Sequence, residues 1–343
     1  MLMLCHCLYL TNNTKNRQAL EDACQTAEET RQLYFALIVV GFLASLINVT
    51  VLLRLHLRRK HPSPPTTGYL LSLAVAQLGL SFTGIFVLAV QHRRRDAPVW
   101  VYHATVSAEP VYNLFTCCTS FIILGLSADR YQAICSPHDY SPVFGRRRMK
   151  CAVFFSYVVA SVLYLPLLFY KVYIYHQVNT QWYIQEEALP SQTAWKVWSM
   201  LLEGIHHVVP SFIIVILNTR ILIATVQRRR KKALSASRSI THSRRERRTI
   251  YLLLAFTVSF LLTNVPSASL RVLYFWPGEF CYVHSDLESV RYLFNVVEVV
   301  SYTWDFFLYF LMNQEYRKDL CHLATDCCGR CTMVDINDSV QEG

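Results

Sequence analysis

Charged residues are scarce in this chain, and their scarcity limits what kind of protein it is. Asp, Glu, Lys and Arg make up 16% of the 343 residues, whereas 53% are hydrophobic. Soluble globular domains typically contain about 25% charged residues. The hydrophobic residues also form blocks long enough to cross a lipid bilayer. The composition therefore predicts a membrane protein rather than a soluble domain.

Several signatures of chemistry are absent as well. The sequence has no phosphate-binding loop, no His, Cys and carboxylate cluster with metal-ligand spacing, and no pair of Cys-x-x-Cys units. It therefore gives no support to an enzyme, a metal site or a cofactor. The twelve cysteines are too scattered for a disulfide framework. The net charge of +10 is concentrated in particular loops, which argues against a nucleic-acid partner.

Seven hydrophobic stretches are each long enough to form a membrane helix. They are expected at residues 33–57, 68–91, 103–134, 151–170, 194–226, 249–275 and 287–312. This pattern predicts an all-α fold in which a seven-transmembrane helix bundle occupies residues 33–312. An N-terminal segment (1–32) precedes it and a tail (313–343) follows it. A polar, aromatic loop is expected at 173–192.

The basic residues predict how the bundle is oriented. Three loops on one side are basic, around Arg58, around Arg147 and at 228–248. Because cytoplasmic loops collect Arg and Lys, this side is expected to face the cytoplasm and the N-terminus the outside. The run 93–95, Arg-Arg-Arg, lies on the other side and disagrees, but it is outnumbered. An outside N-terminus makes Asn12, in the sequence Asn-Asn-Thr, a predicted glycosylation site. The apolar start of the sequence lacks the basic region of a signal peptide, so no cleaved signal peptide is predicted.

The third hydrophobic stretch ends in a polar cluster, Asp129, Arg130 and Tyr131. A charged side chain at the middle of a membrane helix costs roughly 2.5–3.5 kcal/mol on the insertion scale. The cluster is therefore expected at the mouth of a helix or in a protein-lined crevice. Taken alone, it is equally consistent with a snorkelling arginine that ends the helix at the interface.

The spacing of further residues resembles a rhodopsin-like (class A) G-protein-coupled receptor. Landmarks of that family follow in order between about residues 34 and 320: Asn48, Leu71-Ser72-Leu73-Ala74, Asp129-Arg130-Tyr131, Pro210, Pro266, Asp305-Phe306-Phe307-Leu308-Tyr309 and Tyr316-Arg317. The resemblance implies a plasma-membrane receptor that binds an extracellular ligand and activates a heterotrimeric G protein. It also implies that Tyr316 begins a short amphipathic eighth helix.

The resemblance further assigns an activation switch. Its members are Asp129, Arg130, Tyr131, Glu246, Asp305 and Tyr309. In the family, an acid at the position of Glu246 pairs with the helix-three arginine and holds the inactive state. The alternative is that Glu246 only neutralises the arginines beside it.

The sequence also departs from the family's pattern. Gln77 stands where an aspartate usually holds sodium, and the run 263–266, Thr-Asn-Val-Pro, replaces Cys-Trp-x-Pro. Thr105 occupies the position at which the family has the disulfide-forming cysteine of helix three. A disulfide between Cys24 and Cys281 is one alternative that could replace that bond. The lost aspartate and tryptophan leave an alternative open, a degenerate class A receptor with constitutive or weak signalling.

A finer resemblance rests on the missing disulfide, on Asn218 and on the stretch that ends at Tyr309. Together they resemble a small branch of orphan receptors associated with aromatic amino acids and short peptides, near the FMRFamide-type neuropeptide receptors. A retinal protein is excluded because residues 287–312 contain no lysine. A transporter is disfavoured because no inverted repeat is found.

Polar residues on the outer halves of several helices predict a ligand cavity. The candidates are Tyr112, Glu203, His206, Arg271, Asn295 and Glu298. An arginine, an amide and an acid in one cavity suit a zwitterion or an amidated peptide end. The structural alternative is an internal Arg271–Glu298 ion pair and interhelical hydrogen bonds, which are typically worth roughly 0.6 kcal/mol each.

The tail carries cysteines beside its amphipathic stretch. Cys321, Cys327 and Cys328 are predicted palmitoylation sites, because juxtamembrane cysteines are frequent acyl acceptors. Zinc binding is the alternative, but the tail lacks clear histidine spacing.

Overall fold

The computed structural model describes most of the first two thirds of the chain and parts of the rest. The described residues are 14–58, 64–92, 99–138, 140–169, 171–176, 181–186, 197–198, 200–202, 204–234, 254–255, 258–259, 261–262, 266, 297, 300, 304, 306–311 and 314–328. Most of the predicted sixth and seventh membrane helices lies outside them. The pieces of these two helices that are described are helical.

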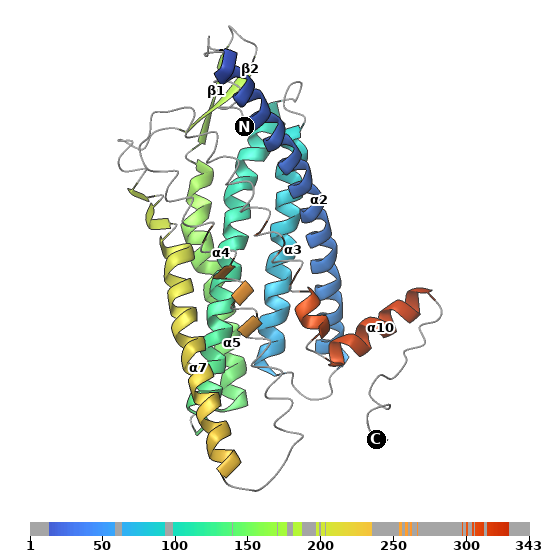
Figure 1. Cartoon of the computed structure of the whole chain (residues 1–343), viewed down its shortest axis with the longest axis vertical. Helices are drawn as coiled ribbons and strands as arrows, with labels where there is room; N and C mark the ends of the chain where they lie inside the picture. Colours follow the sequence, from blue (N-terminus) through green and yellow to red (C-terminus); the bar gives the residue numbers. More distant parts are fainter. Residues whose placement is uncertain are drawn as a thin grey trace.

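Five long helices lie side by side along the length of the molecule (Figure 1). They are α2 (Thr14–Arg58), α3 (Pro65–His92), α4 (Val99–Cys135), α5 (Pro142–Tyr164) and α7 (Val209–Leu234). Long apolar segments, each able to cross a membrane, lie at Gln32–Arg58, Pro65–Ala89, Pro110–Cys135, Val143–Leu168 and Met200–Gln227. The predicted all-α fold is therefore confirmed.

The short helix α10 (Gln314–Cys328) begins beside the end of α2, against which it packs, and extends sideways from the bundle (Figure 1). This end is called the α10 end below, and the other is called the opposite end. The position of α10 fits the predicted amphipathic eighth helix.

The surface of the bundle is apolar and part of its interior is polar. Phe154, Phe155 and Phe212 are each more than 60% exposed. In contrast, Asn48 and Gln77 are 0% and 2% exposed. The buried core is mostly apolar, as in a soluble domain, but the outer surface is apolar as well. This distribution is stable in lipid, where polar side chains must face the bundle interior.

Small residues let the central helices approach each other closely. A Cβ atom added to Gly125 on α4 would lie 3.1 Å from the ring of Tyr69 on α3 and 3.3 Å from Ala152 on α5. Close packing of this kind replaces the hydrophobic effect as the force between helices in a membrane. Gly125 therefore fixes the spacing of three helices just above the α10 end.

Several helix boundaries differ from the prediction, because hydropathy marks the apolar part of a helix and charged residues were assigned to segments outside it. The first helix was expected from residue 33, but α2 already begins at Thr14. The fourth helix was expected from residue 151, but α5 begins at Pro142, so the basic run at 146–148 lies in its first turns. Proline is well suited to the first helical position, and arginine is a good helix former. The fifth was expected to end at residue 226, but α7 continues through basic residues to Leu234.

The predicted loop at 173–192 contains a two-stranded antiparallel hairpin. Strand β1 (Lys171–His176) pairs with β2 (Gln181–Glu186), with Tyr173 opposite Ile184. Both strands are rich in aromatic and β-branched residues, which favour strands. The hairpin lies at the opposite end of the molecule (Figure 1), and it is the one departure from an all-helical fold among the described residues.

Candidate functional site

The polar cluster at the α10 end of α4 forms a buried ion pair. The Nη2 atom of Arg130 donates a hydrogen bond of 2.8 Å to Oδ2 of Asp129. The side chain of Asp129 is 2% exposed and that of Arg130 is 16% exposed. A buried carboxylate without a cation would cost several kcal/mol, so the pair is the form in which this charge is tolerated. Tyr131, its neighbour, is partly buried.

A tyrosine from the turn between α4 and α5 covers this carboxylate. The hydroxyl of Tyr140 lies 3.4 Å and 3.5 Å from the two oxygens of Asp129 and donates to them. Burial, and then the charge of Asp129, raise the pKa of Tyr140 above its ordinary value, so the phenol remains a donor. On its other side, the guanidinium carbon of Arg148 lies 5.6 Å from the centre of the Tyr140 ring.

The predicted switch residue Tyr309 is fully buried at the same end. Its ring stacks on that of Tyr316 in α10, with 5.8 Å between centroids. The hydroxyl of Tyr316 donates a hydrogen bond of 2.6 Å to Oδ1 of Asn48 on α2. Nearby, Arg58 at the end of α2 forms an ion pair of 3.0 Å with Asp319. The eighth helix is thus connected both to the seventh helix and to the first.

Asn218 connects α7 to α4 close to the ion pair. Its Nδ2 atom donates 3.3 Å to the hydroxyl of Ser127 and 3.0 Å to the carbonyl of Ile214. Ser127 lies two residues before Asp129 and is fully buried. The asparagine that departs from the family's pattern therefore contributes a polar contact between two helices, and it does so within one turn of the switch.

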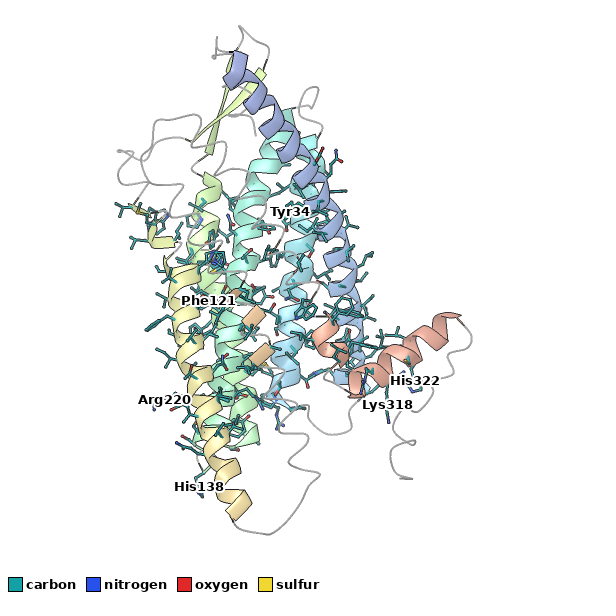
Figure 2. The ribbon with its side chains drawn as sticks, in the orientation of Figure 1. Tyr34, Phe121, His138, Arg220, Lys318 and His322 are labelled. Atoms are coloured by element: carbon teal, nitrogen blue, oxygen red, sulfur yellow. The ribbon has the colours of Figure 1, made fainter. Side chains whose placement is uncertain are left out.

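Tyr112, a predicted ligand residue, lies in the half of the bundle away from α10. Its hydroxyl is 3.2 Å from that of Tyr34 on α2, and the two form a hydrogen bond. Figure 2 shows Tyr34 in this half, far from Lys318 and His322 on α10. The pair therefore stands where a cavity open to the outside is expected.

His206, another predicted ligand residue, is completely buried. It lies in a short π-helical segment, η2 (Gly204–Val208), just before α7. Its Nδ1 atom is 2.6 Å from the hydroxyl of Tyr164 on α5, and its ring stacks on that of His207 at 3.7 Å. Such π-turns are frequent at functional sites, but these contacts equally describe interhelical packing. A ligand role for His206 remains a prediction.

The other predicted site residues cannot be placed. Those outside the described residues are Asn12, Glu203, Glu246, Arg271, Asn295, Glu298 and Asp305, together with the side chains of Cys327 and Cys328. Cys24 lies in α2, but its side chain is not described and Cys281 is outside the described residues, so their bond also remains a prediction. Cys321 lies on α10 and is partly buried.

Two residues of the cluster were not predicted. Tyr140 was not considered, and Arg148 was counted only as a loop charge. The turn between α4 and α5 has no periodicity that could mark a side chain as inward-facing. The one sequence feature that could have identified Tyr140 is its position a few residues after an acid that was expected to be buried.

Comparison with known proteins gives a consistent result. The family described as 7 transmembrane receptor (rhodopsin family) matches residues 47–309. A probable G-protein coupled receptor of Caenorhabditis elegans, AH9.1, is 24% identical over 313 residues, which cover 81% of this chain and 71% of that protein. A second one, B0563.6, is 20% identical over 304 residues, or 81% of this chain and 65% of that protein.

A shorter match is found to the G-protein coupled receptor 39 of Mus musculus. It is 28% identical over 153 residues, which cover 43% of this chain and 32% of that receptor. The chain spans 71% and 65% of the lengths of the two nematode relatives.

Proposed function

Because the chain belongs to the rhodopsin family of seven-transmembrane receptors, we propose that it binds an extracellular peptide or amino-acid-like ligand and activates a heterotrimeric G protein. It is a multi-pass G-protein-coupled receptor of the plasma membrane. The basic α10 end faces the cytoplasm, and residues 1–32 and the hairpin face the outside. Figure 2 supports this orientation, since Arg220 and Lys318 lie toward the α10 end and Tyr34 toward the other.

The buried Asp129–Arg130 pair is the observation that carries the proposal. It has the residues of the family's switch at the end of the third helix, with 2.8 Å between Nη2 and Oδ2. In the inactive receptor, Arg130 is held by Asp129 and by Glu246. On activation the guanidinium leaves the acids and becomes available to the G protein.

Two substitutions test this proposal. Arg130→Ala is expected to abolish G-protein activation while surface expression stays normal. Glu246→Ala is expected to raise basal signalling several-fold, since a coupling of about 1–3 kcal/mol between states corresponds to roughly 5–150-fold. Arg147→Ala serves as the control because Arg147 is an exposed arginine on the neighbouring helix. Unchanged basal signalling in Glu246→Ala would reject the lock.

The proposed ligand is a zwitterion or an amidated peptide with an aromatic group. Arg271 would bind its carboxylate or carbonyl, Glu298 its amine, and Tyr112 its ring. Screening aromatic amino acids and amidated peptides, with calcium and cyclic-AMP readouts, tests this. Arg271→Ala and Asn295→Ala should then lose potency at normal surface expression. If Arg271 and Glu298 are only a structural pair, their single variants lose expression and the charge swap restores it.

A second candidate function is constitutive or weak signalling. The observation that favours it is Gln77, which is 2% exposed and brings an amide rather than a carboxylate to the interior. A neutral amide cannot neutralise a sodium ion, so an ion that stabilises the inactive state would bind less well. Basal signalling that rises in proportion to receptor density, without ligand, would favour this candidate. Silence at high receptor density would exclude the constitutive form.

A further inference from the structure

Arg148 on α5 has one edge of its guanidinium that meets no acceptor among the described residues. Its Nε and Nη2 atoms are both buried, and neither has a hydrogen-bond partner in the described part of the chain. These two nitrogens form one edge of the guanidinium, which matches a carboxylate with two parallel hydrogen bonds. Buried donors without an acceptor are unfavourable. The edge is therefore expected to meet an acceptor in some state of the receptor.

The carboxylate of Asp129 is only partly used by the hydrogen bonds of the described residues. Oδ2 accepts a hydrogen bond of 2.8 Å from Arg130. Among the described residues, Oδ1 accepts one contact, from the hydroxyl of Tyr140 at 3.5 Å, which is the limit of a hydrogen bond. The Nε atom of Arg130 is itself buried without a partner among the described residues. Arg130 thus holds the carboxylate by one bond rather than by its full fork. In the Asp129–Arg130 pair, both the guanidinium and the carboxylate therefore retain hydrogen-bonding capacity that the described residues do not use.

Tyr140 contacts both the carboxylate of Asp129 and the second arginine, Arg148. Its hydroxyl donates to Asp129, while its ring faces the guanidinium of Arg148 at 5.6 Å. The hydroxyl also packs on Gly145, where an added Cβ would lie 2.8 Å from it. The described residues contain no ion pair between Arg148 and Asp129. Asp129 and Arg148 therefore contact the same tyrosine side chain, and the charges of both act on its hydroxyl.

We propose that Arg148 is a second partner of Asp129 and takes the carboxylate when Arg130 leaves it. The buried acid then stays paired in both states, so release of Arg130 does not leave an uncompensated charge in the bundle. Arg148 is a positioning residue in this exchange, since it acts on Arg130 through the shared acid. This exchange rests on the proposed function, because binding of a G protein is the event that removes Arg130 from Asp129.

The exchange can be tested without any signalling, because Arg130→Ala mimics departure of the first partner. In that background Arg148→Ala should lower the folded-to-unfolded ratio of detergent-solubilised receptor about ten-fold beyond the product of the two single effects. Arg147→Ala in the same background is the matched control, and its effect on the folded-to-unfolded ratio should simply multiply with that of Arg130→Ala. Arg148→Lys should restore part of the loss, because lysine supplies the charge without the two-bond fork.

A third substitution separates ion pairing from packing against Tyr140. Asp129→Asn removes the charge that needs a partner, so in the triple variant with Arg130→Ala and Arg148→Ala the extra loss should disappear. Simple multiplication in the Arg130→Ala, Arg148→Ala variant overturns the exchange, and so does an extra loss that persists when a neutral amide replaces the acid. If the double variant yields too little receptor for melting curves, the amount of receptor at the cell surface is measured instead. A surface amount that recovers in the triple variant supports the exchange, and one that does not recover overturns it.

The outcome is independent of G-protein coupling. A receptor that activates no G protein contradicts the proposed function and leaves this measurement unaffected. A receptor that signals but shows no coupling between Arg130 and Arg148 retains the proposed function and loses the exchange.

Discussion

The hydrogen bond between Tyr316 and Asn48 allows one prediction to be worked out in detail. It joins the eighth helix to the first, over a sequence separation of 268 residues, with 2.6 Å between Oη and Oδ1. Both residues are 0% exposed, and burial raises the pKa of Tyr316, so its phenol remains a donor. Tyr316→Phe removes the donor, keeps the ring and leaves the acceptor of Asn48 buried without it.

The size of the effect follows from two limits. Interhelical hydrogen bonds in membranes average roughly 0.6 kcal/mol, because unfolded helices also find partners in lipid. A buried acceptor that loses its partner costs about 1–3 kcal/mol. The strongest interhelical hydrogen bonds in membranes reach about 1.7 kcal/mol, and both residues here are fully buried, so the loss should lie at about 1–2 kcal/mol. The melting temperature should then fall by roughly 2–6 °C.

The assay can use the protein's own cysteines. The thiols of Cys117 and Cys118 are buried in α4, so a dye that fluoresces on reaction with thiols reports unfolding of detergent-solubilised receptor. Tyr157→Phe is the matched control, since it removes a phenol hydroxyl for which the described residues show no hydrogen bond. Asn48→Ala combined with Tyr316→Phe should be no worse than either alone. A Tyr316→Phe receptor that melts within about 1 °C of the wild type would refute this reasoning.

Three further predictions follow from contacts at the same end. Arg58→Ala should lower the melting temperature by roughly 2–4 °C, because the exposed arginine contributes little itself but leaves the buried Asp319 unpaired, and Asp319→Asn should remove this sensitivity. Asn218→Ala should cost a similar amount, and adding Ser127→Ala should cost nothing more, since the two share one hydrogen bond of 3.3 Å; additive losses would contradict this. Palmitate labelling that hydroxylamine removes is expected on the wild type and should decrease in Cys321→Ser, and its absence from the wild type would exclude lipidation.

The sequence by itself determined the membrane helices and the class of receptor. The first expected helix, 33–57, matches the apolar part of α2, Gln32–Arg58, within one residue at each end, although α2 itself begins at Thr14. This agreement has a physical cause, since the thickness of the bilayer requires about 20 apolar residues whatever their neighbours are. The position of the Asp129–Arg130 pair at a helix end was also predictable, because the cost of a charge in lipid depends mainly on its depth.

The ends of helices were less predictable than their centres. The run 146–148 was placed in a loop because basic residues mark the cytoplasmic side, yet it lies in the first turns of α5. Charge reports the depth at which a residue lies, and a helix can continue past the bilayer into water. The hairpin of β1 and β2 shows the same limit, because strands outside the membrane are set by local pairing rather than by hydropathy.

Only the tertiary structure decided which side chains meet. That Tyr140 covers Asp129, that Tyr316 bonds to Asn48 and that His206 bonds to Tyr164 depends on how the helices rotate and cross. A hydrogen bond requires its two atoms to lie about 3 Å apart, whereas one residue along a helix rotates a side chain by about 100°. Periodicity shows that a residue faces inward, but it does not show which helix it faces. The partners of the predicted switch therefore became visible only when the bundle was assembled.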